Sequence, residues 1–166
     1  MKTCVFAGTF DPFTLGHKAI VDKLLNARKR VIITVGNNPE KTPFLSESER
    51  ADIIKATYRG NKKVRVIIYS DVKDGYADFL KKSGATEYYR GIRDVADLEY
   101  EKKAEEKNKE IYPDIETKYI FANRFSYISS TFIKERVGKG LEVKRFIPKK
   151  AYKVFRKILK EKQKGN

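Results

Sequence analysis

The fold of this chain is best predicted from its residues Gly8-Thr9-Phe10-Asp11-Pro12-Phe13-Thr14-Leu15-Gly16-His17. It follows a short apolar run, Thr3 to Ala7, whose β-branched and aromatic residues are typical of a buried strand. After it, apolar residues recur at helical spacing, which predicts a helix from His17 to roughly Lys29. The ten residues therefore join a strand to a helix, so their backbone N–H groups and the helix N-terminus should face a ligand crevice.

Strand and helix patterns alternate along the rest of the chain. This alternation predicts an α/β fold with a doubly wound, mostly parallel five-stranded sheet, in one domain spanning residues 1 to 166. The further strands are expected at Val31 to Val35, Val64 to Tyr69, Glu87 to Tyr89 and Thr117 to Ala122. The further helices are expected from a capping box at Ser46 and Glu49 to near Gly60, and at Tyr76 to Lys82, Val95 to Asn108, Ser130 to Val137 and Tyr152 to Leu159.

Composition excludes several classes of protein. Hydrophobic residues make up 40% of the chain, with ten Tyr and ten Phe, so a disordered protein is excluded. Cys4 is the only cysteine, which rules out an intramolecular disulfide and fits a reducing compartment. The N-terminus lacks the layout of a signal peptide, and no apolar run is long enough to span a membrane. We therefore expect a cytoplasmic protein that does not associate with membranes.

The chain is strongly basic, with 37 Lys and Arg against 22 Asp and Glu, a net charge of +15. Such a charge favours polyanionic or phosphorylated partners. Eight basic residues and one acidic residue lie between Lys149 and Asn166, so a basic C-terminal helix is expected at about 149 to 164. A solvated helix face is the simpler interpretation. A nucleic-acid-binding module that has lost catalysis is the rival, motivated by the net charge and by this basic run.

The residues of the first loop suit a phosphate site. Gly8 permits close approach of the backbone, Thr9 offers a hydroxyl, and Gly16 leaves room beside His17 at the positive end of the helix dipole. That dipole favours an anion and a neutral imidazole alike. Taken one at a time, each residue also has an ordinary structural explanation as a turn glycine, a cap or an exposed side chain.

Together, the ten residues resemble the Gly-Thr-Phe-Asp-Pro-x-Thr-x-Gly-His signature of the nucleotidylyltransferase superfamily. Two further segments resemble blocks of the bacterial phosphopantetheine adenylyltransferases in the same order: Arg90-Gly91-Ile92-Arg93 followed by Asp97 to Glu101, and then Ser126 to Thr131. The resemblance extends from Phe6 to about Pro148 and implies a Rossmann-like nucleotidylyltransferase fold. The chain departs from the family at Ala7, where relatives have proline, at Phe125, where many have tryptophan, and in a lengthened segment around Lys73 to Gly75.

The resemblance implies a role for each matched residue. Thr9 and Phe10 would lie at the nucleotide and substrate phosphates, and His17 would support the transition state. Lys41 and Arg90 would hold the phosphate of phosphopantetheine, so that His17, Lys41 and Arg90 form the catalytic set, while Tyr76 would touch the pantetheine arm. The residues expected around ATP, besides Thr9, Phe10 and His17, are Gly91, Ile92, Arg93, Glu101, Phe125, Ser126, Tyr127, Ile128, Ser129, Ser130 and Thr131.

The implied reaction joins ATP and 4′-phosphopantetheine to give dephospho-coenzyme A and pyrophosphate. Mg²⁺ should enter with the phosphates of ATP, because the sequence has no Asp/Glu cluster spaced for a metal site of its own. Within the superfamily, nicotinate mononucleotide or glycerol phosphate could be the acceptor instead, although the Arg90 block argues against both. Relatives assemble as hexamers, so a homo-oligomer is expected.

Overall fold

The computed structural model describes residues 1–27, 29–73, 75–93, 95–121 and 125–165. Five parallel strands form one sheet in the order β3-β2-β1-β4-β5. The strands are β1 (Thr3–Gly8), β2 (Arg30–Val35), β3 (Val64–Ile68), β4 (Ala85–Ile92) and β5 (Glu116–Phe121). The α-helices are α1 (Leu15–Asn26), α2 (Glu47–Thr57), α3 (Tyr76–Ser83), α4 (Val95–Ile111), α5 (Ser130–Gly138) and α6 (Tyr152–Lys164), with short 3₁₀ turns η1 (Tyr69–Asp71) and η3 (Lys144–Phe146).

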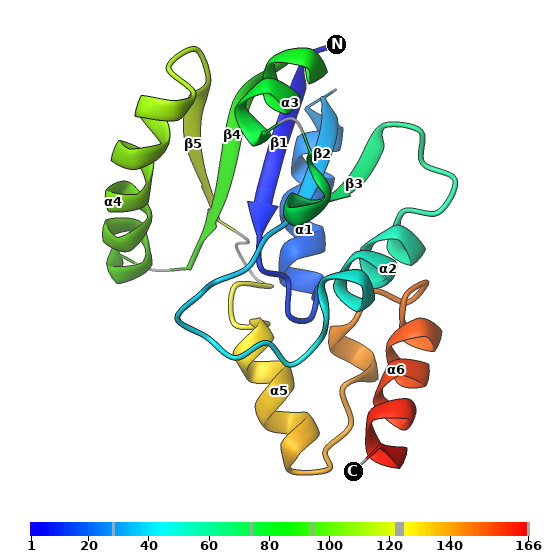
Figure 1. Ribbon diagram of the computed structural model, residues 1–166. Coiled ribbons are helices and arrows are strands. Elements are labelled where there is room, and N and C mark those ends of the chain that lie inside the picture. The colour runs from blue at the N-terminus through cyan, green and yellow to red at the C-terminus, as the bar shows by residue number, and fades with distance from the viewer. Residues whose placement is uncertain (28, 74, 94, 122–124, 166) are drawn as a thin grey trace.

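The sheet is covered on both faces, as the alternation of strands and helices predicts. Along β1, Cys4 and Phe6 face one core, which includes Ile20 and Leu24 of α1. Val5 faces the other core, which includes Leu80 of α3. Figure 1 shows α5 and α6 beyond the arrowhead of β1, at the carboxyl ends of the strands. The predicted doubly wound, Rossmann-like fold is confirmed, and all of its described strand pairs are parallel.

Strand β4 is the main difference from the sequence prediction. A brief strand from Glu87 to Tyr89 was expected, but β4 runs over Ala85–Ile92. It lies between β1 and β5 and pairs with both, so ladder hydrogen bonds extend it through Arg90 and through Gly91, which is a weak strand former. Arg90 therefore stands near the carboxyl end of a central strand.

Smaller differences concern where elements end. Helix α1 ends at Asn26 rather than near Lys29, because β2 already begins at Arg30. Strand β3 ends at Ile68, and Tyr69 begins the η1 turn. For β5, the expected last residue, Ala122, lies outside the described residues.

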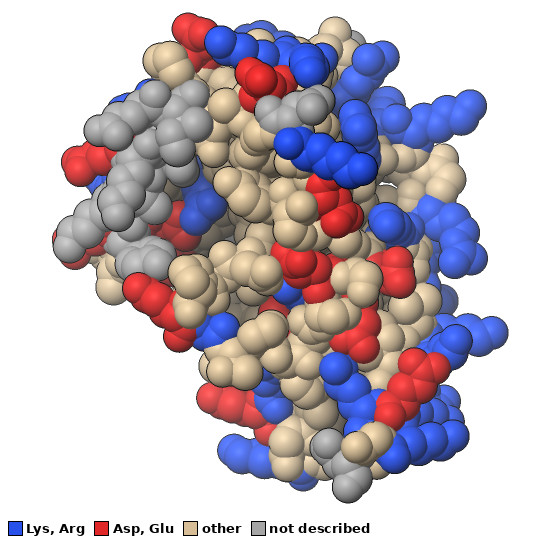
Figure 2. All heavy atoms as spheres, in the orientation of Figure 1, with Lys and Arg blue, Asp and Glu red and all other residues tan. Residues whose placement is uncertain are grey.

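The C-terminal helix α6 packs one face and leaves the other exposed. Phe155 is fully buried and Ile158 is 7% exposed, whereas Lys153, Arg156, Lys157 and Lys160 are exposed. Lys and Arg atoms gather at the lower right of Figure 2, where α6 lies in Figure 1. This arrangement matches a solvated helix face. In the described part of the chain, no helix is long and apolar enough to cross a membrane.

Candidate active site

A cleft of about 910 Å³ opens beyond the carboxyl ends of the strands. Its walls come from the loop after β1, the loop after β2, the end of β4, helix α4 and the segment that leads into α5. The N-termini of α1 and α5 both contribute residues, Gly16 and Ser130 among them. Two helix N-termini at one cleft favour an anionic ligand, because their unpaired N–H groups and dipoles attract negative charge.

Phe10 shapes the first loop. Its φ of 52° is in the left-handed region, which costs a bulky residue about 1 kcal/mol or more. Ring packing holds it there: the centroid of Phe10 lies 5.2 Å from that of Phe6 and 5.5 Å from that of Phe13, and Phe10 is 3% exposed. The loop is thus fixed before any ligand binds.

Thr14 is the N-cap of α1 and orients His17. The Thr14 hydroxyl donates to the carbonyl oxygen of Ile128 at 2.7 Å and accepts from the N–H of Gly16 at 3.2 Å. That hydroxyl has a single hydrogen, so it has none to donate to Nδ1 of His17, 3.2 Å away. The Thr14 N–H donates to Nδ1 at 3.0 Å instead. A neutral His17 therefore carries its proton on Nε2.

The ring of His17 is further fixed by aromatic contacts. It stacks on Phe13, with centroids 5.4 Å apart, and meets Phe10 edge-on at 5.1 Å. Burial, and secondarily the charge of Arg93, lowers the pKa of His17 to about 4. The imidazole is therefore neutral near pH 7, and within the described part of the chain no residue bonds Nε2. His17 lines the cleft as a pre-oriented hydrogen-bond donor.

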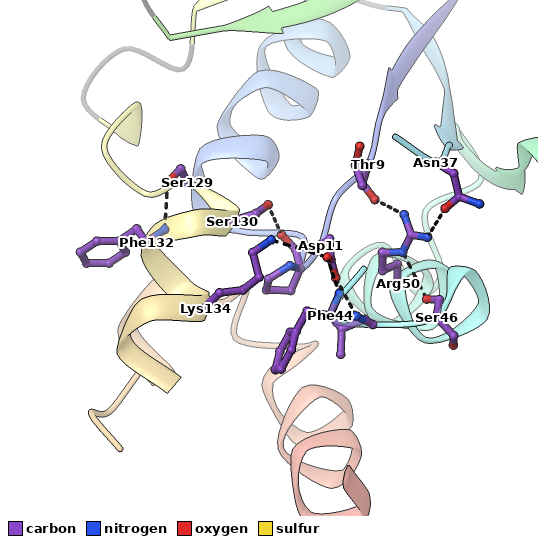
Figure 3. Close-up of polar contacts among 12 residues, drawn as sticks. Thr9, Asp11, Asn37, Phe44, Ser46, Arg50, Ser129, Ser130, Phe132 and Lys134 are labelled. Atoms are coloured by element: carbon purple, nitrogen blue, oxygen red, sulfur yellow. Dashed lines mark hydrogen bonds and ion pairs between the residues drawn. The ribbon is translucent and has the colours of Figure 1, made fainter. Parts of the chain in front are cut away.

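The segment from Phe125 to Thr131 is attached directly to the first loop, although more than a hundred residues separate them. Ser130 donates to the carbonyl oxygen of Pro12 at 2.9 Å, and Lys134 of α5 lies 3.7 Å from Asp11; both contacts are drawn in Figure 3. Gly16 permits the close approach, since a Cβ there would lie 2.8 Å from the Ile128 oxygen and 2.9 Å from that of Phe125.

Arg50 of α2 joins the loops after β1 and β2. Its side chain is fully buried and donates to the carbonyl oxygens of Thr9 at 2.7 Å and Gly36 at 2.8 Å, and to Oδ1 of Asn37 at 2.7 Å. Figure 3 shows its guanidinium group between Thr9 and Asn37. Burial lowers the pKa of Arg50, while the charges of Asp11 and Glu47 act in the opposite direction.

Asp11 performs a similar task beside Arg50. Its two carboxylate oxygens accept from the backbone N–H groups of Phe44 and Leu45, each at 2.8 Å. Asp11 is only 4% exposed, so this acid is committed to holding the loop that precedes α2. It is therefore poorly placed to serve as a general base or a metal ligand.

The predicted phosphate ligand Arg90 already has a partner. Its Nε lies 2.5 Å from Oε2 of Glu101 on α4. Burial opposes the charge of Arg90, but Glu101, with Tyr88, outweighs it and raises the pKa of Arg90. The next cation, Arg93, is 3.5 Å from Asp97 and half exposed. Both arginines line the cleft.

Part of the cleft lining is a cluster of tyrosines. Tyr76 is buried there, and its hydroxyl lies 2.8 Å from that of Thr34. The ring centroid of Tyr76 lies 4.8 Å from the ring centroid of Tyr69 and 6.0 Å from that of Tyr112. Tyr88 stacks on Tyr112 at 6.4 Å, and all four tyrosines line the cleft.

The structure brings almost all the sequence-predicted site residues into this one cleft. Tyr127 is the exception: it is 61% exposed and its ring packs edge-on against Phe132. Among the described residues, no three His, Cys, Asp or Glu side chains are grouped to hold a metal ion. The predicted residues that line the cleft are Thr9, Phe10, His17, Lys41, Tyr76, Arg90, Gly91, Ile92, Arg93, Glu101, Phe125, Ser126, Ile128, Ser129, Ser130 and Thr131.

Sequence reasoning missed Asp11 and Arg50 as loop supports, and Tyr112 and Lys134 as cleft residues. For Arg50 a signal existed, because it shares a helical face with Ile53, Ile54 and Thr57, all buried. A charge on the apolar face of a helix indicates a buried, bonded group. Tyr112 follows the end of α4 and carries no such periodic signal.

Comparisons with known proteins agree with this geometry. A model of the family described as cytidylyltransferase-like matches residues 5–136. The phosphopantetheine adenylyltransferase of Ralstonia pickettii is 35% identical over 163 residues, which cover 98% of this chain and 93% of the relative. That of Hahella chejuensis is 34% identical over 148 residues, covering 89% of this chain and 90% of the relative. That of Polynucleobacter necessarius is 34% identical over 148 residues, covering 89% and 88%.

Proposed function

This chain belongs to the cytidylyltransferase-like family and, within it, to the phosphopantetheine adenylyltransferases, and from that membership we propose that it transfers an adenylyl group from ATP to 4′-phosphopantetheine. An oxygen of the acceptor phosphate attacks the α-phosphorus of ATP. The bond from that phosphorus to the β-phosphate bridging oxygen breaks, and pyrophosphate leaves in line. The products are dephospho-coenzyme A and pyrophosphate, with no change in oxidation state.

The observation that carries this proposal is the fixed, neutral His17. Its Nδ1 accepts the Thr14 N–H at 3.0 Å, so Nε2–H is the hydrogen offered to the cleft. Negative charge grows on the non-bridging oxygens of the α-phosphate in the transition state, and a donor held in place stabilises it without reorganisation. In our proposal His17 makes that bond.

The groups around His17 suit the rest of the nucleotide. Thr9 and Phe10 would lie at the phosphates, and the N-terminus of α5, with Ser129, Ser130 and Thr131, offers further donors for the leaving pyrophosphate. Gly91, Ile92, Arg93 and Glu101 would surround the nucleoside part. Phe125, Ser126 and Ile128 would close over it, whereas Tyr127 is 61% exposed and does not line the cleft.

The acceptor would lie in the part of the cleft that is lined by Arg90, Lys41 and the tyrosines. Arg90 and Lys41 would hold its phosphate, with His17 completing the catalytic set. Tyr76 and the tyrosines around it form an aromatic wall that suits an extended arm of amides and methyl groups such as pantetheine. The chemistry is then mainly positioning of two phosphates by cations and dipoles.

Mg²⁺ fits the cleft as part of its substrate. Three described acids of the cleft lining already have partners: Asp11 accepts backbone N–H groups, Glu101 pairs with Arg90, and Asp97 pairs with Arg93. The ion would therefore take most of its oxygen ligands from ATP and water, and would neutralise phosphate charge when bound. The hexameric assembly that the resemblance implies and the cytoplasmic location that the sequence predicts are part of the same proposal.

The test is acceptor-dependent release of pyrophosphate by the purified protein. We expect release with ATP and 4′-phosphopantetheine together, and none with either alone. Nicotinate mononucleotide and glycerol phosphate serve as competing acceptors. Activity with one of these and none with 4′-phosphopantetheine would move the protein to another reaction of the superfamily.

A further inference from the structure

The described side chains of helix α4 are less buried than those of helix α1. Of the α4 side chains whose exposure the structure describes, none is buried, and Val95 is 72% exposed. Helix α1, in contrast, buries Ile20, Val21 and Leu24. The contacts given below, which the described side chains of α4 make with the sheet and with the turn after β4, are polar.

Those contacts come from one acidic stripe, which consists of Asp97, Glu101 and Glu105. The three residues are four positions apart, so they share one face of the helix. Each accepts from a residue of the sheet or of the turn after β4. The pairs are Asp97 with the N–H and guanidinium of Arg93 at 3.1 and 3.5 Å, Glu101 with Arg90 at 2.5 Å, and Glu105 with the hydroxyl of Tyr119 on β5.

Two of these three attachments are also walls of the cleft. Arg90, Arg93, Asp97 and Glu101 all line it, whereas Glu105 and Tyr119 do not. The residues that hold α4 and the residues that would hold phosphate are thus the same arginines. A phosphate cannot use all the hydrogen-bond donors of the Arg90 guanidinium group while Glu101 occupies Nε.

We propose that α4 is a ligand-responsive clamp: phosphate ligands displace the acidic stripe from Arg90 and Arg93 and loosen the helix. A phosphate offers more acceptor oxygens and more charge than a carboxylate, so it is the stronger partner for a guanidinium group. By linkage, whatever weakens the attachment of α4 outside the cleft must tighten phosphate binding inside it. This inference rests on the proposed function in one respect, which is that the ligands of the cleft carry phosphate groups.

Hydrogen exchange on the full-length protein tests the clamp, with inorganic pyrophosphate as the probe. Amides of α4 should exchange several-fold faster when pyrophosphate is bound, while those of α6 should be unchanged. In Glu101→Gln, α4 should already exchange faster without a ligand, and pyrophosphate should add little. Unchanged or slower exchange in α4 on binding would overturn the proposal.

Tyr119→Phe gives the sharper test, because it removes a bond to the stripe without touching the cleft. Calorimetry should show pyrophosphate binding about threefold tighter than in the unmodified protein. Tyr152→Phe, which removes a hydroxyl from α6, is the matched control and should bind as the unmodified protein does. A merely structural role for the Tyr119 bond would leave the affinity unchanged or weaken it, and either result contradicts the clamp.

These readouts are independent of the acceptor. If the protein binds pyrophosphate and α4 responds, the clamp holds even when 4′-phosphopantetheine is not adenylylated. If adenylylation occurs but α4 does not respond, the clamp fails while the proposed function stands.

Discussion

His17 is held by its neighbours before any substrate arrives. The Thr14 N–H fixes Nδ1, and Phe13 and Phe10 fix the plane of the ring. The same neighbours bury the imidazole, so one arrangement determines both its direction and its neutrality. Two consequences at the scale of this residue can be measured.

His17→Ala should lower kcat by about 100-fold or more, the scale seen when one transition-state donor is removed. Binding of ATP should remain measurable, because the helix N-termini and the arginines are untouched. The measurement is steady-state kinetics combined with ATP titration. Near-normal turnover would show that His17 does not serve the transition state.

His17 should also make stability depend on pH. Its pKa falls from 6.5 in the unfolded chain to about 4 in the folded protein. Between these values only the unfolded chain binds the proton, so stability is lost as the pH falls through this window. The expected contribution is a loss of about 2 kcal/mol between pH 6.5 and 5. Urea unfolding at several pH values measures this. The free energy of unfolding should fall more steeply with falling pH in the unmodified protein than in His17→Asn, and equal pH dependence in the two would count against a buried neutral imidazole.

Gly16 allows the first loop and the segment before α5 to touch. Gly16→Ala should cost about 2 kcal/mol, because the new Cβ would press on two backbone oxygens at 2.8 and 2.9 Å. Gly138→Ala on α5 is the matched control: nothing lies within 4 Å of its Cβ, so that change should be neutral or slightly stabilising. Thermal unfolding of both variants measures the contrast, and equal effects would disprove the close contact.

At the scale of elements, α2 matters for the site because it carries Arg50. Arg50→Met should cost about 3 kcal/mol, since the carbonyl oxygens of Thr9 and Gly36 lose a buried donor. Turnover should fall as well, because Thr9 lines the cleft. Lys55→Met, on the same helix and 57% exposed, should stay within about 0.5 kcal/mol. Comparable losses in the two variants would refute the role of Arg50.

The elements themselves follow closely from sequence, and the reasons are local. The change of period from strand to helix around residues 8–17 predicts β1, the loop and α1, and the capping box at Ser46 and Glu49 is present as predicted. Strand β4 was predicted too short because its pairing with β1 and β5 overrides the weak strand propensity of Gly91. The partnership of Arg90 with Glu101 was missed, since it depends on how α4 lies against the sheet.

At the scale of the whole molecule, the fold assembles one cleft from segments far apart in the chain. The parallel sheet places the loops after β1, β2 and β4 at one edge, and α5 returns beneath them, as Figure 1 shows. The positive net charge of the chain suits a cleft that gathers anionic substrates. We also propose that the protein assembles as a hexamer, and light scattering should show it.

The adenylyl transfer itself is tested by following the α-phosphate of ATP. The protein is incubated with 4′-phosphopantetheine, Mg²⁺ and ATP that carries a label in its α-phosphate, and the products are separated. We predict that the label appears in dephospho-coenzyme A, in an amount equal to the pyrophosphate released. Label that stays in ATP, or that leaves as free AMP while 4′-phosphopantetheine is unchanged, would contradict the account.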